Sequence, residues 1–356
     1  MKSVLRKILP QSLILNLKKL ISLLEQSIFP FFANSAFLSS LYYCFFSAQF
    51  RREHQAVLKG RLHYQHSLKD IKLSSTLLRR NTHRLEKGLI MQPRRSVFAQ
   101  AYIEETVDCF SKCLISEGMC TEELKWAQDV LVQFFQVTES SKILDKARKQ
   151  FEALTLKSFK ESYESLPYEH NERVSSKVTQ QELYNLFKQR RSVRWYQQKE
   201  VDDGMLDMAI EMAAQAPSAC NRQPFQFYTI TDMNEASEIS SLAMGTAGFS
   251  DNIPAVIVVV GDLSSYPLER DRHVIYIDAS LASMQLMLAL ETMGLSSCPI
   301  NWPDLEVLER KMAKALKLPA YKRPIMLISV GYAQSDGLIP YSAKKSAQTL
   351  RKEIKL

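Results

Sequence analysis

The chain has 356 residues, of which 46% are hydrophobic and 24% are charged, a balance that excludes disorder over most of the length and leaves room for more than one domain. The net charge of +8 arises in the first 100 residues, which carry 17 lysines and arginines against 4 acidic residues, whereas the remainder carries 29 against 34. A basic N-terminal part suits an anionic membrane surface or an acidic partner. Because no nucleic-acid-binding motif accompanies it, we expect no nucleic acid partner.

The six cysteines form no CxxC pair, and no Cys/His cluster has the spacing of zinc ligands. Buried free thiols are the commoner meaning of such cysteines, so we expect a cytoplasmic protein in a reducing compartment, with no metal. The N-terminus lacks a secretory cleavage pattern, since Lys18 and Lys19 interrupt its apolar stretch.

The first predicted element is an amphipathic basic helix over residues 4–25, where Leu and Ile recur at three- and four-residue spacing. Residues 26–50 contain no charged residue, but Pro30, five serines and nine Phe/Tyr residues make them a poor membrane-spanning helix. Two interpretations remain, core packing or a hairpin on a membrane surface. We therefore consider peripheral membrane contact through residues 1–60.

A basic segment follows at residues 74–98, where arginines, His83 and Lys87 crowd around Gly88 and Pro93. It reads as a basic loop between helices, with an anion-binding loop as the alternative. Helices are predicted over 99–115 and 121–155, and residues 157–178 read as a polar linker. The sequence thus predicts an all-helical basic N-terminal region, 1–178, followed by a second domain, 179–356.

The second domain opens with Thr179 and Glu182, which fit a capping box at the start of a helix. This helix runs into the sequence KQRRSVRWY, a concentrated basic cluster comprising Arg190, Arg191, Ser192 and Arg194. Arginines that flank a serine can fork around a phosphate or around the electron-rich edge of a heterocycle.

The next helix starts at Asp202 or Asp203 and ends where Pro217 cannot continue it. Beyond it, Ser218, Asn221 and Gln223 offer short polar groups before the alternating strand FQFYTIT. The residues alone leave two interpretations, an ordinary helix–loop–strand junction or a wall of a site for a flat, polar-edged ligand.

The remaining elements alternate between helices and strands. We expect a short helix at 235–244, a strand buried on both faces at 253–262, and a long buried helix at 278–293 that ends at Gly294. Pro299 to Trp302 are predicted to form a loop at a helix–strand junction. A helix at 304–316, a strand at 325–332 and a basic tail complete the chain.

Five pieces of this domain occur in a familiar order: RxSxR, a helix ending in A-P-S-x-x-N-x-Q-P-aromatic, a valine-rich strand, M-G-L-x-x-x-P-I, and a basic residue after VGY. Over residues 180–356 the sequence resembles the FMN-dependent nitroreductase family. The resemblance implies an α+β fold with a mostly antiparallel central sheet flanked by helices. It also implies a homodimer that holds FMN at its interface, with NADPH or NADH as electron donor.

The resemblance also assigns residues to the cofactor. Arg190, Arg191, Ser192 and Arg194 are implied to hold the FMN phosphate and pyrimidine edge, with Lys344 or Lys345 completing the phosphate site. The loop along the isoalloxazine and ribityl chain is implied to comprise Pro217, Ser218, Ala219, Asn221 and Gln223. The loop over the flavin N5 is implied to comprise Pro299, Ile300, Asn301 and Trp302, and a backbone N–H near Asn301 is expected at N5. Many family members carry Glu-Gly where this chain has Asn301-Trp302, so we expect Trp302 to line the open face of the flavin.

Two functions follow as hypotheses. The first is an oxidoreductase that takes electrons from NAD(P)H onto FMN and passes them to an electron-poor small molecule, a nitroaromatic, a quinone or a specific metabolite, by a ping-pong mechanism. No side chain needs to act as a nucleophile. The alternative is a flavin-fold scaffold or binding protein that docks to a membrane or partner through its basic N-terminal half, with a link to surface polysaccharide synthesis.

Overall fold

The computed structural model describes residues 11–159 and 163–355 of the chain. The chain divides into two compact units, with the break between Gln55 and Ala56. The domain boundary that the sequence suggests between residues 178 and 179 lies inside the second unit and stays a prediction.

The first unit contains the helices α2 (Gln11–Ala33) and α3 (Ala36–Phe45), which pack against each other. Ser35 caps α3 by accepting a hydrogen bond from the backbone N–H of Leu38. The ring of Tyr42 lies 5.6 Å from that of Phe29 and 5.5 Å from that of Phe32. None of the side chains whose burial is described in this unit is buried.

Two expectations concern this unit. Residues 4–10 of the predicted helix 4–25 lie outside the described residues. The observed helix α2 extends past residue 25 to Ala33, because Pro30, near its end, removes only one of its hydrogen bonds. Residues 26–50 form no core within this unit, since none of their side chains is buried, and the choice between core packing and a hairpin on a membrane surface stays a prediction.

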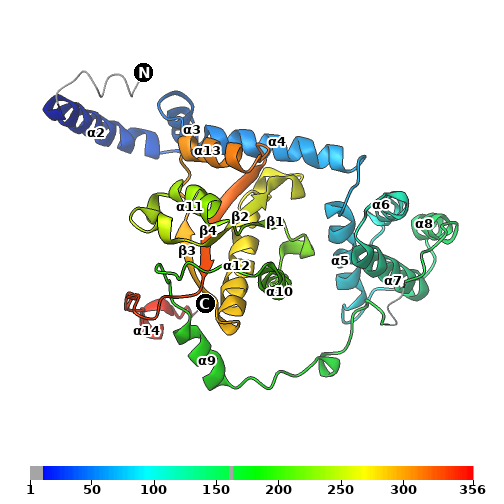
Figure 1. Cartoon of the computed structure of the whole chain (residues 1–356). Helices are drawn as coiled ribbons and strands as arrows, with labels where there is room; N and C mark the ends of the chain where they lie inside the picture. The colour runs from blue at the N-terminus through cyan, green and yellow to red at the C-terminus, as the bar shows by residue number, and fades with distance from the viewer. Residues whose placement is uncertain (1–10, 160–162, 356) are drawn as a thin grey trace. The chain divides into compact units, whose positions relative to one another are not determined.

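The second unit begins within helix α4 and continues into four helices that share a core of their own, with Leu78, Leu85, Phe110, Leu131 and Phe134 at its centre. The bounds of these helices are α4 Arg51–Ser67, α5 Thr76–Leu89, α6 Ile103–Ile115, α7 Thr121–Val137 and α8 Lys142–Glu152. Figure 1 shows α5 to α8 grouped together in cyan to green.

Two further predictions are corrected in this region. Residues 121–155 form two helices instead of one, because Ser141 starts α8 as an N-cap that accepts a hydrogen bond from the N–H of Leu144. Residues 74–98 do not form a basic loop. Most of them belong to α5, where Ser75 is the N-cap and the Leu residues enter the core, while none of the arginines is buried.

The sheet is four-stranded, with the order β1-β2-β4-β3 and antiparallel pairing throughout. Its strands are β1 Phe225–Ile230, β2 Ala255–Asp262, β3 Ser296–Asn301 and β4 Lys322–Gly331. The α+β fold with an antiparallel central sheet is thus confirmed. The prediction of a loop from Pro299 to Trp302 is wrong for residues 299–301, because these residues belong to β3 and pair with β4.

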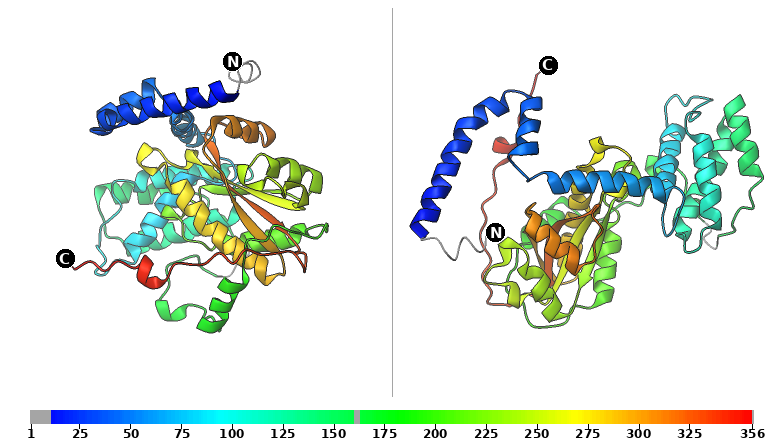
Figure 2. Two further views of the ribbon diagram at one scale, coloured as in Figure 1. Left: turned by 90° about the vertical axis from the view of Figure 1, so that its left-hand side faces the viewer. Right: turned by 90° about the horizontal axis from the view of Figure 1, so that it is seen from above.

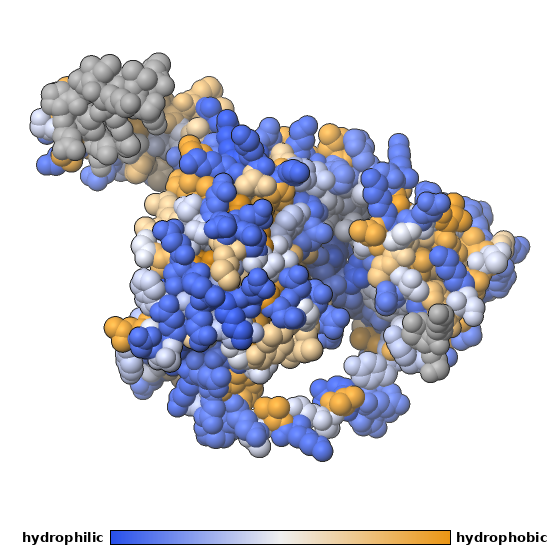
Figure 3. Space-filling model, in the orientation of Figure 1, coloured by the Kyte–Doolittle hydropathy of each residue, from blue (hydrophilic) through white to orange (hydrophobic). Residues whose placement is uncertain are grey.

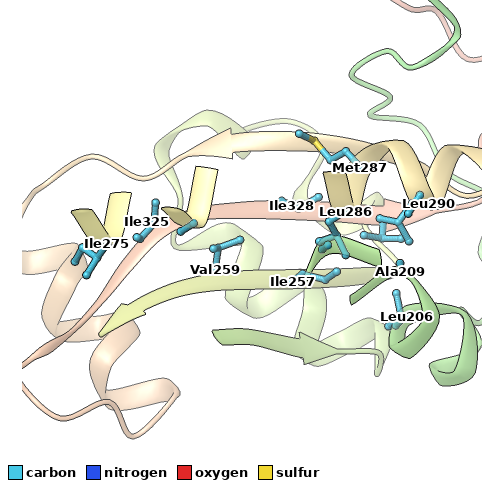
Figure 4. Close-up of a cluster of buried hydrophobic side chains, with 14 of the residues drawn as sticks. Leu206, Ala209, Ile257, Val259, Ile275, Leu286, Met287, Leu290, Ile325 and Ile328 are labelled. Carbon is cyan, nitrogen blue, oxygen red and sulfur yellow. The ribbon is translucent and has the colours of Figure 1, made fainter. Parts of the chain in front are cut away.

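Helices cover both faces of the sheet, which buries β2 along almost its whole length. On one face Ile257 and Val259 pack against α10 and α12, as Figure 4 shows. On the other face Val256 and Val258 pack against α11 and α13. The helices of this domain are α9 Gln180–Gln189, α10 Asp203–Ala213, α11 Met233–Ser241, α12 Val274–Thr292, α13 Glu306–Ala315 and α14 Ala347–Leu350.

Helix α12 is the long buried helix that the sequence predicts, and Figure 2 shows it alongside the sheet in two further views. Among the described residues, the stretch 269–292 alone is helical, long and apolar enough to cross a membrane, but half of its most apolar window is buried inside the protein. Its hydropathy is therefore that of a core helix. Hydrophilic side chains cover much of the visible surface around the sheet (Figure 3).

Candidate functional site

The loop between α10 and β1 is tied to the start of α12 by one carboxylate. Asp278 is 3% exposed, and its Oδ2 accepts hydrogen bonds from the hydroxyl of Ser218 at 2.7 Å and from the N–H of Ala219 at 2.9 Å. The hydroxyl of Ser218 in turn accepts the N–H of Gln223 at 2.7 Å. Sequence analysis did not single out Asp278, although a carboxylate in an almost uncharged helix was a signal for it.

This loop has an unusual backbone. Cys220, Asn221 and Gln223 all have positive φ, at 53°, 51° and 50°. Residues other than glycine rarely adopt this left-handed conformation, which costs about 1 kcal/mol or more at each position. Backbone strain of this kind concentrates at functional sites, where surrounding contacts hold it in place.

Helix α5 supplies one of those contacts. Arg79 donates from Nε to the carbonyl oxygen of Asn221 at 2.9 Å and from Nη2 to Oε1 of Gln223 at 3.0 Å. Its Nη1 pairs with the buried carboxylate of Glu123 at 3.2 Å. Arg79, in the segment predicted to be a basic loop, therefore fixes the loop at 218–223, which was predicted to be one wall of a ligand site.

These contacts decide which groups of the loop remain open to a ligand. The carboxamide of Gln223 is engaged at both ends, since its Nε2 also donates to the carbonyl of Ala214 at 2.9 Å. Pro217 and Ala219 are exposed, and within the described residues the carboxamide of Asn221 forms no hydrogen bond. A flat ligand on this loop would therefore meet Pro217, Ala219 and Asn221, while Ser218 and Gln223 shape the loop from behind.

The arginine cluster begins where α9 ends. Ser192 bridges to Ser297 of β3, and the N–H of Val193 donates to the carbonyl of Ser297 at 3.1 Å. Asn252 donates from Nδ2 to the carbonyl of Arg194 at 2.7 Å, which anchors the other end of the segment. Strand β3 and the segment before β2 thereby place Arg190, Ser192 and Arg194 close together.

This cluster carries polar groups without partners. Within the described residues, Nε of Arg190 and the hydroxyl of Ser297 are buried and find no hydrogen-bond partner. Burial raises the pKa of the neighbouring Cys298 thiol, and the positive charges of Arg194 and Arg190 lower it by less than burial raises it. This thiol therefore stays neutral. An anionic phosphate would satisfy these donors, and the cluster fits the phosphate end of a nucleotide such as FMN. Ser297 was missed because a serine inside a strand carries no sequence signal.

The two parts of the site do not meet within one protomer. Asp278 holds the 218–223 loop near one end of α12, while Gln189 donates to Glu291 at the other end of the same helix at 3.1 Å. The 13 residues from Asp278 to Glu291 span about 20 Å of helix. The structure therefore brings Arg190, Ser192 and Arg194 together, but it keeps them apart from Pro217, Ala219 and Asn221.

The segment expected over the flavin N5 divides into exposed and buried residues. Pro299 and Asn301 are exposed, whereas Ile300 and Trp302 are buried. The indole Nε1 of Trp302 donates to Oε1 of the buried Glu309 at 2.7 Å. The expectation that the Trp302 side chain lines the open face of the flavin is therefore wrong, because a buried carboxylate provides a partner for its N–H in the core.

Lys344 and Lys345 lie exposed in the tail that follows β4. Within the described residues neither lysine side chain forms an ion pair or a hydrogen bond. Arg191 donates from Nη1 to the carbonyls of Phe187 and Arg190, so its guanidinium caps the end of α9. The roles of these three residues toward a cofactor stay predictions.

Comparisons with known proteins relate part of this chain to one family. The nitroreductase family model matches residues 187–247 and 234–332. Human iodotyrosine deiodinase 1 is 26% identical over 219 residues, covering 52% of this chain and 73% of the relative. A putative NADH dehydrogenase/NAD(P)H nitroreductase of Methanothermobacter thermautotrophicus is 27% identical over 165 residues, covering 46% of this chain and 84% of the relative.

Among solved structures, an FMN-dependent nitroreductase from Clostridium difficile is 24% identical, with a TM-score of 0.42, and the match covers 48% of this chain and 99% of that one. The residues that the family model matches hold the sheet and the arginine cluster. Residues 187–332 therefore match the nitroreductase family, and the similarity to its relatives supports an oxidoreductase of that family.

Proposed function

We propose that this protein is an FMN-dependent oxidoreductase that accepts electrons from NADPH or NADH and passes them to an electron-poor small molecule by a ping-pong mechanism. The observation that carries this proposal is the arginine cluster at the end of α9, where Nε of Arg190 and the hydroxyl of Ser297 are buried without partners. When bound, FMN would supply the hydride chemistry.

The residues of the chain would bind and orient this cofactor. Arg190, Ser192 and Arg194 would hold its phosphate and its pyrimidine edge, and Lys344 or Lys345 would complete the phosphate site. Positive charge near the pyrimidine edge favours the reduced, anionic form of a flavin. A backbone N–H near Asn301 would orient the arriving hydride.

We propose that two protomers build each site. The loop with Pro217, Ala219 and Asn221 lies about 20 Å along α12 from the arginine cluster. A single protomer would offer a ligand the charged part or the flat polar wall, but not both. A homodimer that places the loop of one protomer against the arginines of the other would complete the site, in keeping with the nitroreductase fold, which is generally homodimeric.

The acceptor is the open part of the proposal. Nitroaromatics, quinones and a specific metabolite all suit a shared donor and acceptor pocket. The similarity to a protein named iodotyrosine deiodinase adds a halogenated aromatic ring to these classes. Because the indole of Trp302 is buried, the small exposed residues Pro299 and Asn301 would border the acceptor instead.

The first test is the visible absorbance of bound flavin. Purified protein is expected to bind FMN, and anaerobic addition of NADPH or NADH is expected to bleach the bound flavin. Arg190→Ala and Lys344→Ala should each weaken FMN binding by about 1.5–3 kcal/mol, the usual value of a charge-assisted hydrogen bond. Arg270→Ala, at an exposed arginine outside the cluster, is the matched control. Protein that stays colourless with added FMN would contradict the enzyme proposal, and unchanged FMN affinity in both variants would contradict the residue assignment.

We further propose that the first unit docks on an anionic membrane surface, which keeps the protein cytoplasmic and peripheral. Its aromatic residues are unusually open, with Phe31 61%, Phe37 72%, Phe45 72% and Phe46 65% exposed. Between residues 11 and 52 the sequence has Lys18, Lys19, Arg51 and Arg52 against the single acidic residue Glu25. Exposed aromatic rings next to basic residues fit the interface of a bilayer with anionic lipids.

Vesicle sedimentation tests this docking. The full chain should bind vesicles that contain phosphatidylglycerol and should not bind vesicles of phosphatidylcholine alone. Replacing Phe31, Phe37, Phe45 and Phe46 by serine should abolish binding, whereas Tyr341→Ser, at an exposed aromatic residue of the tail, should not. If the quadruple variant instead loses a dimer measured by light scattering and keeps its vesicle binding, a second copy covers these residues and the membrane proposal fails.

A further inference from the structure

A second polar site lies away from the arginine cluster, beside the start of β1. It is a cavity of about 340 Å³, within the size range of sites for small metabolites. Its walls come from the end of α4, the segment that leads into α5, the start of β1 and the short helix at Leu263–Ser265. The lining includes His63, His66, Lys72, Thr76, Arg222 and Ser265.

The cavity has firm walls. Gly60 of α4 lies so close to Leu263 that a Cβ on it would come within 2.8 Å of that residue. The ring of His63 stacks on that of Tyr321 at 4.4 Å, and Arg61 donates to the carbonyl of Pro267 at 3.0 Å. Helix α4 is therefore held against the end of the sheet where β2 ends and β4 begins, and the cavity is a fixed feature of the second unit.

Arg222 is the unusual residue in this wall. Its side chain is 8% exposed, and its Nε is buried without an acceptor. Within the described residues the guanidinium forms no hydrogen bond and no ion pair. It lies over the ring of Tyr266, with its Cζ 4.8 Å from the ring centroid. A buried arginine without a carboxylate or carbonyl partner is strongly disfavoured, because a ring face does not replace the hydrogen bonds lost from water.

The other groups of the cavity point to the same kind of ligand. Within the described residues, the side chains of His63, His66, Thr76 and Ser265 form no hydrogen bonds and remain available as donors. The two lining carboxylates are already engaged, Asp70 with Lys72 at 3.5 Å and Asp262 with the N–H of Ser264 at 2.8 Å. Among the charged side chains that line the cavity, the guanidinium of Arg222 is therefore the one without a hydrogen-bond or ion-pair partner within the described residues, and a free guanidinium favours an anionic ligand.

We propose that this cavity binds a small polar metabolite through a phosphate or carboxylate group, with the guanidinium of Arg222 as the principal contact. Arginine presents its donors in a planar fork that matches either oxyanion. The imidazoles of His63 and His66 and the hydroxyl of Thr76 bind the polar remainder of the ligand. None of these residues belongs to the arginine cluster at Arg190, although Arg222 follows Asn221 in the loop that is proposed to meet the flavin.

The proposal is tested by titration calorimetry of the full chain with inorganic phosphate, at a constant ionic strength set by chloride. A parallel titration with acetate shows whether the site prefers a phosphate or a carboxylate. Saturable binding is expected for the unaltered protein, and Arg222→Met is expected to weaken it by about tenfold to a hundredfold, the effect of losing a charge-assisted hydrogen bond. His66→Asn, at an exposed position, tests the cavity with little risk to folding and should weaken binding by a smaller factor.

Arg190→Ala is the matched control, because inorganic phosphate could also enter the proposed FMN site. Binding that survives Arg190→Ala and is lost in Arg222→Met supports the proposal whether or not the protein binds FMN. Binding that is lost in Arg190→Ala and unchanged in Arg222→Met would overturn it. So would the absence of saturable binding of either anion to the unaltered protein.

Discussion

Two regions of the second unit each bury an arginine, and they differ in whether carboxylates of the protein pair with it. Arg323 of β4 is 1% exposed and donates to Glu309 at 3.0 Å and to Asp304 at 2.8 Å. Arg222 is nearly as deeply buried but has no such partner among the described residues. A buried charge with carboxylate partners ties elements of the fold together, whereas one without such partners indicates a partner that arrives from outside.

The region around Arg323 is a network of ion pairs and hydrogen bonds in which Nε and Nη2 of Arg323 have carboxylate partners and its buried Nη1 has no hydrogen-bond partner among the described residues. Glu309 also accepts the indole N–H of Trp302, so one carboxylate joins α13, β4 and the segment after β3. Burial alone would lower the pKa of Arg323, but Tyr276 and the carboxylates of Glu309 and Asp304 outweigh it and raise the pKa. The guanidinium is therefore charged and compensated, and its role is structural.

The largest effect is expected from Glu309→Ala. This change leaves Arg323 and the indole of Trp302 without their shared acceptor, and breaking a buried ion pair in this way costs about 3–5 kcal/mol. Urea denaturation at neutral pH measures the loss, and Glu306→Ala, in the exposed first turn of the same helix, provides the control. A loss no larger than that of the control would show that the network contributes nothing to stability.

Arg79→Met is expected to have the next largest effect. Arg79 resembles Arg323 in having partners, since it pairs with Glu123 and donates to Asn221 and Gln223. Its removal should cost about 1.5–3 kcal/mol. It should also speed hydrogen exchange at residues 219–223 more than elsewhere. Arg94→Met, at an exposed arginine, is the control, and unchanged exchange in the loop would mean that α5 does not hold it.

Trp302→Phe should have a smaller effect, about 1 kcal/mol, because it keeps most of the packing and removes one hydrogen bond to Glu309. The same variant should leave the spectrum and reduction rate of bound flavin unchanged. A changed flavin spectrum with unchanged stability would place the indole at the cofactor after all.

The smallest effect is expected for Arg222→Met in a buffer without phosphate or carboxylate ions. Replacing an unpaired buried charge by an apolar side chain of similar length is commonly neutral or stabilising. The free energy of unfolding should therefore stay constant or rise. A loss of about 2 kcal/mol or more would mean that Arg222 has a partner within the protein, and the contrast with Arg323 would disappear.

The sequence allowed much of the second domain to be predicted. Periodicity and turn residues located α10, α12, β2 and β4, and the RxSxR and A-P-S-x-x-N motifs located both parts of the candidate site. The errors share a cause. The segments 74–98 and 299–301 carry residues typical of loops, but long-range partners make the first a helix and pair the second with β4.

Local chemistry by itself determined where α9 and α10 start, which strand is buried on both faces, and which residues form a basic cluster, because these depend on neighbours a few positions away. Only the tertiary structure decided that Asp278 and Arg79 hold the loop at Ser218, that α12 separates the two parts of the site, and that Trp302 faces the core. It also distinguished Arg222 from Arg323, because the cost of a buried charge depends on which groups from distant parts of the chain lie beside it.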